Sequence, residues 1–515
     1  MSPRIALLLC LVFVVALFKI DPKAKSEVSI ALWIPSIWML ILGSRMVSLW
    51  FGDYSQSAES YVEGSPLDAK IFLALIVSAF VIVIKRRLNF SEIVKNNYWV
   101  FLFLLYCAYS ITWSDFPLVS FKRYIKEIGN LLMVFIVLSE NNPVESIKTL
   151  FNRCAYILIP YSIVLYKYYP ALGRGYNRWT GELFVSGVTN DKNSLGILCV
   201  LCGIGLFWNL LLMWRSKAIS ANKLKVLIQA FILAMTIHLL WMAKSATSKV
   251  CFILGLCILA AVTMEVVRKH IKSYILFGIF IVSLFYMLVD FGPLLMATLG
   301  RDETLTGRTE IWGQVIEMVA NPAIGVGYGS FWLGDRLESL WNAHWFHPTE
   351  AHNGYLEIYL DLGIIGIVLL LGIIISSFRT ACKALISDFG YGSLRLAILT
   401  ICILYNMTES AFRVGLLIYF SFLLATIQFS FSDKIPKFGS DHVPGNDLKT
   451  RGAKGVIALF PTQRRKEDGL EPQAAQHVAA YKRFQPARSR PEWNGLKNET
   501  LLQYHVKKQN RGRQG

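Results

Sequence analysis

The sequence predicts an all-α polytopic membrane protein, and its composition, its apolar runs and the placement of its basic residues all point that way. Of the 515 residues, 54% are apolar and 17% are charged, which is too apolar for an ordinary soluble enzyme. A bilayer core is crossed by roughly 20 apolar residues, and runs of this kind recur along most of the chain before its last stretch. We therefore expect about 12–13 transmembrane helices with one long outer loop.

Thirteen apolar runs are the candidate membrane spans. In chain order they cover residues 5–18, 28–42, 71–84, 98–111, 128–138, 156–165, 195–213, 227–242, 251–267, 275–289, 355–376, 397–405 and 416–429. The first run follows Arg4 and could be a signal peptide, but Lys19 and Ile20 stand where cleavage needs small residues. We expect it to be a retained helix.

Basic residues predict how the chain is threaded. Lys and Arg cluster at 85–87, 215–225, 268–272 and 379–383, in alternate loops, and such loops face the cytoplasm. The other loops, which include residues 113–126, 168–193 and a long segment at 292–353, then lie on the outer side of the membrane. This pattern predicts a multi-pass membrane protein whose basic loops lie in the cytoplasm.

The last part of the chain has a different composition. Residues 433–515 contain 17 Lys and Arg against 8 Asp and Glu, so half of the net charge of +18 lies there. Apolar periodicity is lost, which predicts a basic, disordered cytoplasmic tail after a membrane domain of residues 1–432. Since topology explains the remaining charge, we expect membrane lipid and no nucleic acid as a partner. The nine cysteines lie in or beside apolar runs, which argues against a disulfide framework.

The long loop at 292–353 is rich in aromatic residues. Residues 309–320 place five apolar side chains on one helical face, and Asn321-Pro322 ends that helix. The following Gly325-Val-Gly-Tyr-Gly329 run comes after a helix rather than a strand, so we interpret it as a tight turn and not as a nucleotide-binding loop.

Histidines at the end of this loop raise the question of a metal. His344, His347 and His352 surround Glu350, but Pro348 prevents a helix from aligning the first two, and no HExxH motif is present. We therefore predict no metal. His352 differs from the others because it directly precedes a long apolar helix, at the predicted outer mouth of the membrane. A structural role is the alternative for a single histidine at such a place.

Some arginines on the predicted outer side, against the positive-inside bias, are candidates for binding a substrate. They are Arg174, Arg178, Arg301 and Arg308. Guanidinium groups bind two oxygens of a diphosphate at once and stay charged, so these residues are candidates for an anionic substrate. Salt bridges to neighbouring acids are the alternative.

Several motifs together resemble a known family. His352-Asn353, nine residues and then Gly363-Ile-Ile-Gly366 form an HN-x9-GxxG pattern that resembles the O-antigen ligase and Wzy-type polysaccharide polymerase family. Residues 306–312 (TGRTEIW), 325–329, 178–181 (RWTG) and 191–193 (DKN) also resemble blocks of that family. Within it, the chain is similar to the exopolysaccharide polymerases of the succinoglycan (ExoQ-like) kind, over roughly residues 65–430.

The resemblance implies a metal-independent, inverting glycosyltransferase of the GT-C type with no cofactor. Such an enzyme would lie in the bacterial inner (cytoplasmic) membrane, with its active site on the periplasmic face. Its donor and acceptor would be glycans carried on undecaprenyl pyrophosphate, and chain-length regulator and flippase proteins would be candidate partners. By position, His352 becomes the catalytic histidine, and Arg308 and Arg178 become donor ligands, with Arg174 and Arg301 as second choices. Asn353 would orient a sugar hydroxyl.

Elementary chemistry agrees with this assignment. Fixed guanidinium groups stabilise the charge of a departing diphosphate, and a neutral imidazole with a pKa near 6.5 can accept the proton of the acceptor hydroxyl. We also expect the start of the helix after Asn353 to offer free N–H groups to phosphate, and Gly363 and Gly366 to let a neighbouring helix or lipid tail approach closely.

Two other functions remain open from the sequence. A ligase that transfers a finished polysaccharide to lipid A core would have a similar fold. A secondary transporter is the second alternative, and it needs ionisable groups near the bilayer midplane. His238, Glu357 and Asp361 are among the few that lie inside apolar runs.

Overall fold

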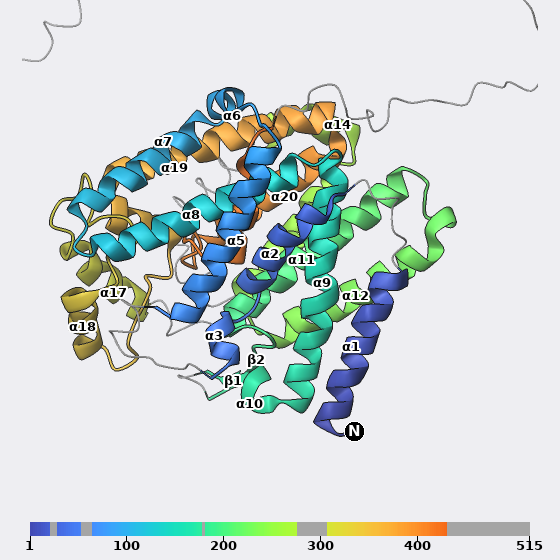
Figure 1. Ribbon diagram of the computed structural model, residues 1–515, viewed down its shortest axis with the longest axis horizontal. Helices are drawn as coiled ribbons and strands as arrows, with labels where there is room; N and C mark the ends of the chain where they lie inside the picture. Colours follow the sequence, from blue (N-terminus) through green and yellow to red (C-terminus); the bar gives the residue numbers. More distant parts are fainter. Residues whose placement is uncertain (21–27, 53–63, 178–180, 276–305, 430–515) are drawn as a thin grey trace, which may run out of the picture. The chain divides into compact units, whose positions relative to one another are not determined.

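The computed structural model describes residues 1–20, 28–52, 64–177, 181–275 and 306–429, and in 306–309 it describes the backbone only. These residues all belong to one compact unit, Met1–Val443. They form helices and one two-stranded hairpin (Figure 1). The elements are α1 (Pro3–Ile20), η1 (Ile30–Leu32), α2 (Trp33–Leu42), α3 (Val47–Trp50), α5 (Pro66–Lys85), α6 (Phe90–Asn96), α7 (Tyr98–Ser110), η2 (Ile111–Trp113), α8 (Pro117–Leu138), α9 (Pro143–Tyr168), α10 (Pro170–Gly173), β1 (Arg174–Tyr176), β2 (Leu183–Val185), α11 (Lys192–Arg215), η3 (Ser220–Asn222), α12 (Lys223–Met242), α13 (Ala246–Ala261), α14 (Glu265–Lys269), α17 (Thr306–Glu317), α18 (Gly334–Ala343), α19 (Gly354–Ser387), α20 (Phe389–Tyr405) and α21 (Leu417–Thr426).

The predicted fold class is confirmed: the protein is an all-α polytopic membrane protein. Five helical segments within the described ranges are long and apolar enough to cross a bilayer, namely α1, α5, α11, Ser220–Met242 and α19. Shorter apolar helices occupy most of the other predicted spans, including Tyr98–Trp113 and Phe389–Tyr405. The run at 275–289 and the tail at 433–515 lie outside the described residues. The total of 12–13 spans stays a prediction.

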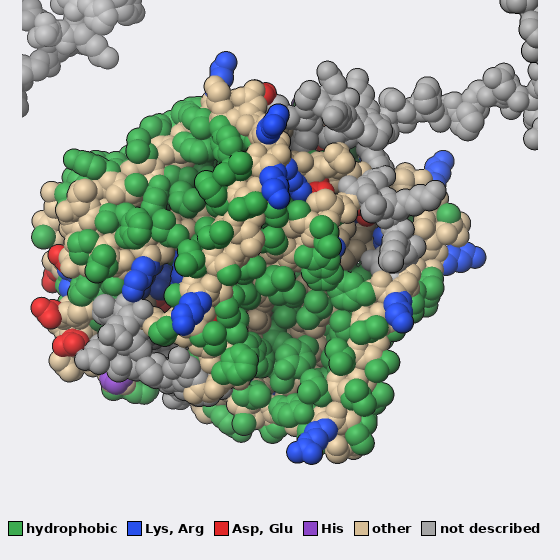
Figure 2. Space-filling model, viewed as in Figure 1, with side chains coloured by type: hydrophobic (Ala, Val, Ile, Leu, Met, Phe, Trp, Pro, Cys, Tyr) green, Lys and Arg blue, Asp and Glu red, His purple; other side chains and the backbone are tan. Residues whose placement is uncertain are grey.

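Burial separates central helices from peripheral ones. α11 is apolar on all sides, and 78% of its most apolar window is buried, whereas the value is 17% for α1 and for α5. α1 and α5 are also apolar but are largely exposed in the isolated chain, so they are suited to contact with lipid. Figure 2 shows a broad surface of apolar side chains on one face of the molecule, as this requires.

The loops with the basic clusters contact one another at one end of the helices, which we call the basic end. Arg86 pairs with Glu140 there, and the Arg215 guanidinium lies 4.0 Å from the ring centroid of Phe389. Figure 1 shows α6 and α14 at this end.

The alternate loops meet at the opposite end, which we call the hairpin end because it contains β1 and β2. The two strands pair antiparallel, with Gly175 opposite Phe184. Arg45 donates to the carbonyl of Thr189 (2.9 Å), and Lys244 pairs with Glu182. The loops therefore sort into the two groups that the charge pattern predicts; that the hairpin end faces the periplasm stays a prediction.

α19 is interrupted at the first glycine of the HN-x9-GxxG pattern. Gly363 has φ 63° and ψ −162°, a backbone conformation that side chains with a Cβ rarely adopt. The segment after Asn321-Pro322 fits into this kink: Ile364 N donates to Pro322 O (2.9 Å), and a Cβ on Gly363 would collide with the Ala323 carbonyl. Gly363 therefore allows a close approach, as expected. The segment that approaches it is a loop of the same chain, and not a neighbouring helix or a lipid tail.

The glycine run at 325–329 is the tight turn that the sequence predicts. Gly325, Gly327 and Gly329 all have positive φ, at 69°, 102° and 65°. The Asp361 carboxylate of α19 accepts bonds from the backbone N–H of Gly329 (2.9 Å) and of Phe331 (3.2 Å). Because the Asp361 carboxylate holds this loop, it is not free to carry an ion, as the transporter alternative would require.

The predicted helix of the long loop is α17, and it begins and ends about three residues earlier than expected. Ile311, Val315 and Val319 are buried as predicted, and they pack in one apolar cluster with Phe331 and Leu337. Ile316, expected on the same face, is instead 44% exposed. α17 therefore packs on the glycine turn and on α18.

Candidate active site

His352 lies directly before α19, and its backbone is strained. Its φ of 51° is in the left-handed region, which costs a residue with a Cβ roughly 1–2 kcal/mol. Asn353 is the helix N-cap: its Oδ1 accepts from the N–H groups of Tyr355 (3.0 Å) and Leu356 (3.2 Å). Strain of this kind persists where surrounding contacts fix the backbone, and it is frequent at functional sites.

Contacts on both sides hold the His352 backbone. The Glu357 carboxylate of α19 accepts from Ala351 N (2.6 Å) and from Trp332 Nε1 (2.8 Å). Trp312 of α17 donates its indole N–H to Ala351 O (2.7 Å). The TGRTEIW block and the histidine motif are therefore joined through the residue that precedes His352.

The imidazole of His352 is held by two carboxylates. Its Nδ1 lies 3.0 Å from Glu350 Oε1 and 3.4 Å from Glu409 Oε2. Arg413 Nη1 in turn contacts Glu350 Oε2 (3.2 Å), and Asn193 Nδ2 donates to Glu409 Oε1 (2.9 Å). We call these five residues the His352 group. Because both carboxylates face Nδ1, Nε2 is the ring nitrogen that a substrate could reach.

The surroundings set the charge of this histidine. Burial alone would lower the pKa of His352, but the hydrogen bonds and negative charges of Glu350 and Glu409 outweigh it and raise the pKa from 6.5 to about 10. The ring is therefore an imidazolium at neutral pH in the substrate-free protein. The expectation of a neutral imidazole with a pKa near 6.5 is wrong, because the sequence does not reveal that two carboxylates converge on the ring.

The start of α19 does not offer free N–H groups to a phosphate, contrary to expectation. Asn353 N donates to Ser410 Oγ (3.2 Å), and Gly354 N donates to the carbonyls of Asn406 (2.9 Å) and Glu409. The next two N–H groups bond to the Asn353 side chain. All the donors of the first turn are used within the protein, so an anion must be bound by side chains.

The role predicted for Asn353, orienting a sugar hydroxyl, stays a prediction, and the structure suggests how to separate it from capping. Asn353→Ala should lower the free energy of unfolding by about 1 kcal/mol, whereas Asn353→Ser keeps a cap of equal quality. Thermal unfolding of the purified protein measures this difference. If Asn353→Ser is as stable as the wild type but inactive, the amide contacts substrate; if it is active, capping is its main role.

The predicted arginines fall in different places. Arg308 lies in α17, one helical turn before Trp312, and its side chain is outside the described atoms. Arg178 and Arg301 lie outside the described residues. Arg174 lies on β1, where its Nε donates to Tyr166 O (2.8 Å) and its guanidinium stacks over the Tyr166 ring. For Arg174 the described contacts are structural, and substrate binding by any of the four stays a prediction.

The other histidines of the loop have structural partners. His344 Nε2 lies 2.8 Å from Gln314 Oε1, and the His347 ring stacks on Trp341 with centroids 5.0 Å apart. Among the residues that the structure describes, potential metal-ligating atoms of Glu350, His352 and Glu409 lie within 4.8 Å of one another. A cation there would compete with the proton on His352 and with Arg413 for the same carboxylates. Independence of metal stays a prediction.

Sequence reasoning missed the residues that surround His352. Glu409 and Arg413 lie 57 and 61 positions after His352, in a segment that looked like a short connection between two spans. Arg413 carries the same signal as the predicted arginines, a guanidinium on the side opposite the basic loops, and could have been found by it. Glu409 carries no local signal, because only folding brings it to His352.

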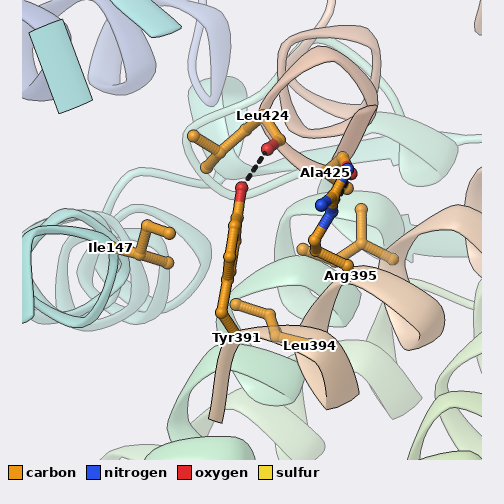
Figure 3. A pocket seen from close by; sticks show the side chains of 7 residues that line it. Ile147, Tyr391, Leu394, Arg395, Leu424 and Ala425 are labelled. Atoms are coloured by element: carbon orange, nitrogen blue, oxygen red, sulfur yellow. Dashed lines mark hydrogen bonds between the residues drawn. The ribbon is translucent and has the colours of Figure 1, made fainter. Parts of the chain in front are cut away.

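One small pocket lies among α9, α20 and α21, away from the His352 group (Figure 3). Its empty volume is about 160 Å³. Tyr391 donates its hydroxyl proton to Leu424 O (2.8 Å), and Arg395 donates to the carbonyls of Ala425 and Thr426. These side chains satisfy the carbonyls at the end of α21, so the pocket has a structural explanation.

Known proteins are similar to the same region of the chain. Residues 192–371 match the sequence model of the O-antigen ligase family. The chain is 27% identical to the exopolysaccharide production protein ExoQ of Rhizobium meliloti over 332 residues, which are 58% of this chain and 72% of ExoQ. It is 24% identical to a putative polysaccharide ligase of Rickettsia typhi over 333 residues, 60% of this chain and 75% of that one. The resemblance seen in the motifs is therefore confirmed: residues 192–371 are similar to the O-antigen ligase domain, and these similarities support a membrane enzyme that acts on polysaccharide.

Proposed function

We propose that the protein polymerises oligosaccharide repeat units, carried on undecaprenyl pyrophosphate, into exopolysaccharide at the periplasmic face of the inner membrane. The observation that carries the proposal is the His352 group, in which two carboxylates converge on a histidine. The preceding residue, Ala351, accepts a hydrogen bond from Trp312, in the helix that also contains Arg308. The similarity to ExoQ, whose description names exopolysaccharide production, favours this product. The tail at 433–515 would then be cytoplasmic, and chain-length regulator and flippase proteins remain candidate partners.

The proposed reaction is a single displacement that inverts the anomeric carbon. A hydroxyl oxygen of the acceptor unit attacks the anomeric carbon of the donor chain, and the bond from this carbon to the diphosphate oxygen breaks. The hydroxyl proton passes to Nε2 of His352 in those molecules whose ring is neutral, and undecaprenyl pyrophosphate leaves with the bonding electron pair. Glu350 and Glu409 stabilise the positive charge that the ring gains, as a carboxylate does for the histidine of a catalytic triad. No metal is needed for these steps.

A ligase reaction with lipid A core as acceptor is the second candidate, favoured by the description of the Rickettsia relative. The two reactions leave different intermediates when the gene is deleted. A polymerase mutant accumulates single repeat units on the lipid carrier, whereas a ligase mutant accumulates long chains that are not attached to core. Mass spectrometry of the extracted carrier lipids distinguishes them, and long carrier-linked chains would reject the proposal.

Arg308→Ala should abolish detectable polymer while the protein still inserts into the membrane. Loss of one charged contact to the departing diphosphate costs about 3 kcal/mol, or roughly 100-fold in rate. The variant is tested by complementing a deletion strain and measuring exopolysaccharide. Lys383→Ala is the matched control, because it removes a cation from the end of α19 at the basic end, and it should leave synthesis intact. Normal polymer from the Arg308 variant would remove Arg308 from the mechanism.

A further inference from the structure

Three cations lie near the start of α8 at the hairpin end, where the positive-inside bias disfavours them. They are Lys122, Arg123 and Lys126, and we call them the α8 cations. The apolar part of α8 begins only at residue 128. Figure 2 shows Lys and Arg side chains gathered over the region of α8 and the start of α5, on a face that is otherwise largely apolar.

No carboxylate among the described residues lies within ion-pair distance of the α8 cations. Arg123 donates to the carbonyl of Gly329, and the Lys126 ammonium lies 4.9 Å from the ring centroid of Phe72. Glu127 is next in the chain, but its carboxylate is buried and accepts the hydroxyl protons of Tyr419 (2.7 Å) and Tyr328. The three charges are therefore not neutralised by direct pairing.

The α8 cations also border the His352 group. Arg123 is close enough to Arg413 for the two positive charges to repel each other, while Arg413 holds Glu350 and Glu350 holds His352. Gly329 leaves room for the Arg123 side chain, because a Cβ on Gly329 would lie only 2.8 Å from Arg123 Cδ. The carboxylates of Asp361 and Glu357 also act on Arg123, and Arg413 is paired with Glu350, so the charges that most favour an external anion at the edge of this apolar region are those of Lys122 and Lys126.

Phosphate at the level of lipid headgroups is the anion that fits this place. Arginine binds phosphate oxygens with its planar fork, and lysine adds point charges on flexible stems. A polymerase handles two carrier lipids, since the donor carrier leaves as a diphosphate and the acceptor carrier stays attached to its sugar. Arg308 and Arg178, which we call the loop arginines, are proposed to bind the diphosphate of the donor carrier. The acceptor carrier therefore has no assigned binding site.

We propose that the α8 cations bind the phosphate groups of the acceptor's polyprenyl carrier and thereby hold the acceptor sugar beside His352. This inference rests on the proposed function. It assigns a second diphosphate site to the protein, distinct from that of the loop arginines. Anionic phospholipid is the competing source of the same phosphate chemistry.

The test counts diphosphate sites directly, with radiolabelled farnesyl diphosphate as a short polyprenyl probe. The full-length protein is placed in nanodiscs of phosphatidylcholine, and bound probe is measured by equilibrium dialysis. We expect two equivalents for the wild type, one for the Lys122→Gln/Lys126→Gln variant and one for Arg308→Ala. The control variant Lys217→Gln/Lys223→Gln, changed at the basic end, should bind two. Equal thermal unfolding of the variants and the wild type checks that they are folded.

Three results would overturn the inference. One is a single equivalent bound by the wild type, and another is an unchanged count in the α8 variant. The third is loss of the second equivalent when phosphatidylglycerol is added in excess to the nanodiscs, which would assign the α8 cations to bulk anionic lipid. Binding is measured without turnover, so a failure of this inference is distinguishable from a failure of the proposed function. If the proposed function is wrong, the protein makes no polymer from carrier-linked units although it binds two equivalents of the probe.

Discussion

His352→Ala should reduce polymer synthesis by 100- to 10,000-fold, the usual contribution of a positioned acid or base. Without the ring, no group takes the acceptor proton at the site of attack, and Glu350 and Glu409 lose the cation that lies between them. The measurement is exopolysaccharide made by a deletion strain that carries the variant, with membrane levels of the protein compared by immunoblot.

A second substitution guards against a trivial loss of folding. His352→Ala leaves two carboxylates facing each other, so His352→Gln, which can still donate a hydrogen bond to them, is the matched variant. Both variants should be inactive if proton transfer is the role of the ring. Activity in the glutamine variant would show that His352 positions the loop and does not exchange a proton.

The rate of the purified enzyme should rise with pH from neutrality to about 10. The pKa of His352 is raised to about 10, and only the neutral ring can accept a proton. At pH 7 roughly one molecule in 1,000 has the neutral ring, so the gain across this range is up to about 1,000-fold, with a slope of one. Initial rates with carrier-linked repeat units extracted from the deletion strain measure this profile.

Glu409→Gln tests the cause of the raised pKa. Removing one of the two carboxylates lowers the pKa of His352, so the rise in rate should move to lower pH, while the maximal rate falls because the imidazolium formed in the transition state loses a partner. An unchanged profile would show that another group titrates. A profile that falls with increasing pH would mean that the imidazolium acts as a proton donor.

The stability of the site also depends on the pKa of His352, but it falls with increasing pH where the rate rises. A folded-state pKa above the unfolded value means that the His352 contacts stabilise the fold fully below about pH 6.5, and that this contribution is lost as pH rises through about 10. The rate and the stability of this region thus change in opposite directions with pH.

The membrane fold could be predicted from the sequence because it follows from local patterns. Length of apolar runs and alternation of basic loops are enough to place helices and sort loops, as the contacts of Arg86 at one end and Lys244 at the other confirm. The glycine turn at 325–329 could be predicted for the same reason, since positive φ is a local property.

The chemistry of the site could be predicted only in part. The HN motif identified His352 by position, but its charge depends on Glu409, which folding brings from another segment. In the same way, the interruption of α19 at Gly363 depends on a loop some 40 residues earlier, and helical periodicity alone predicts a continuous helix. Local sequence identifies the candidate residue, whereas tertiary contacts set its pKa.

The most direct test of the central claim is conversion of carrier-linked repeat units by the purified protein alone. The enzyme in nanodiscs, given only these units and a chelator, should produce a ladder of polymers that differ by one repeat. It should also release one undecaprenyl pyrophosphate for each new bond, and the His352→Ala protein should produce neither. A wild-type protein that leaves the units unchanged, or that transfers them only when lipid A core is added, would contradict the account.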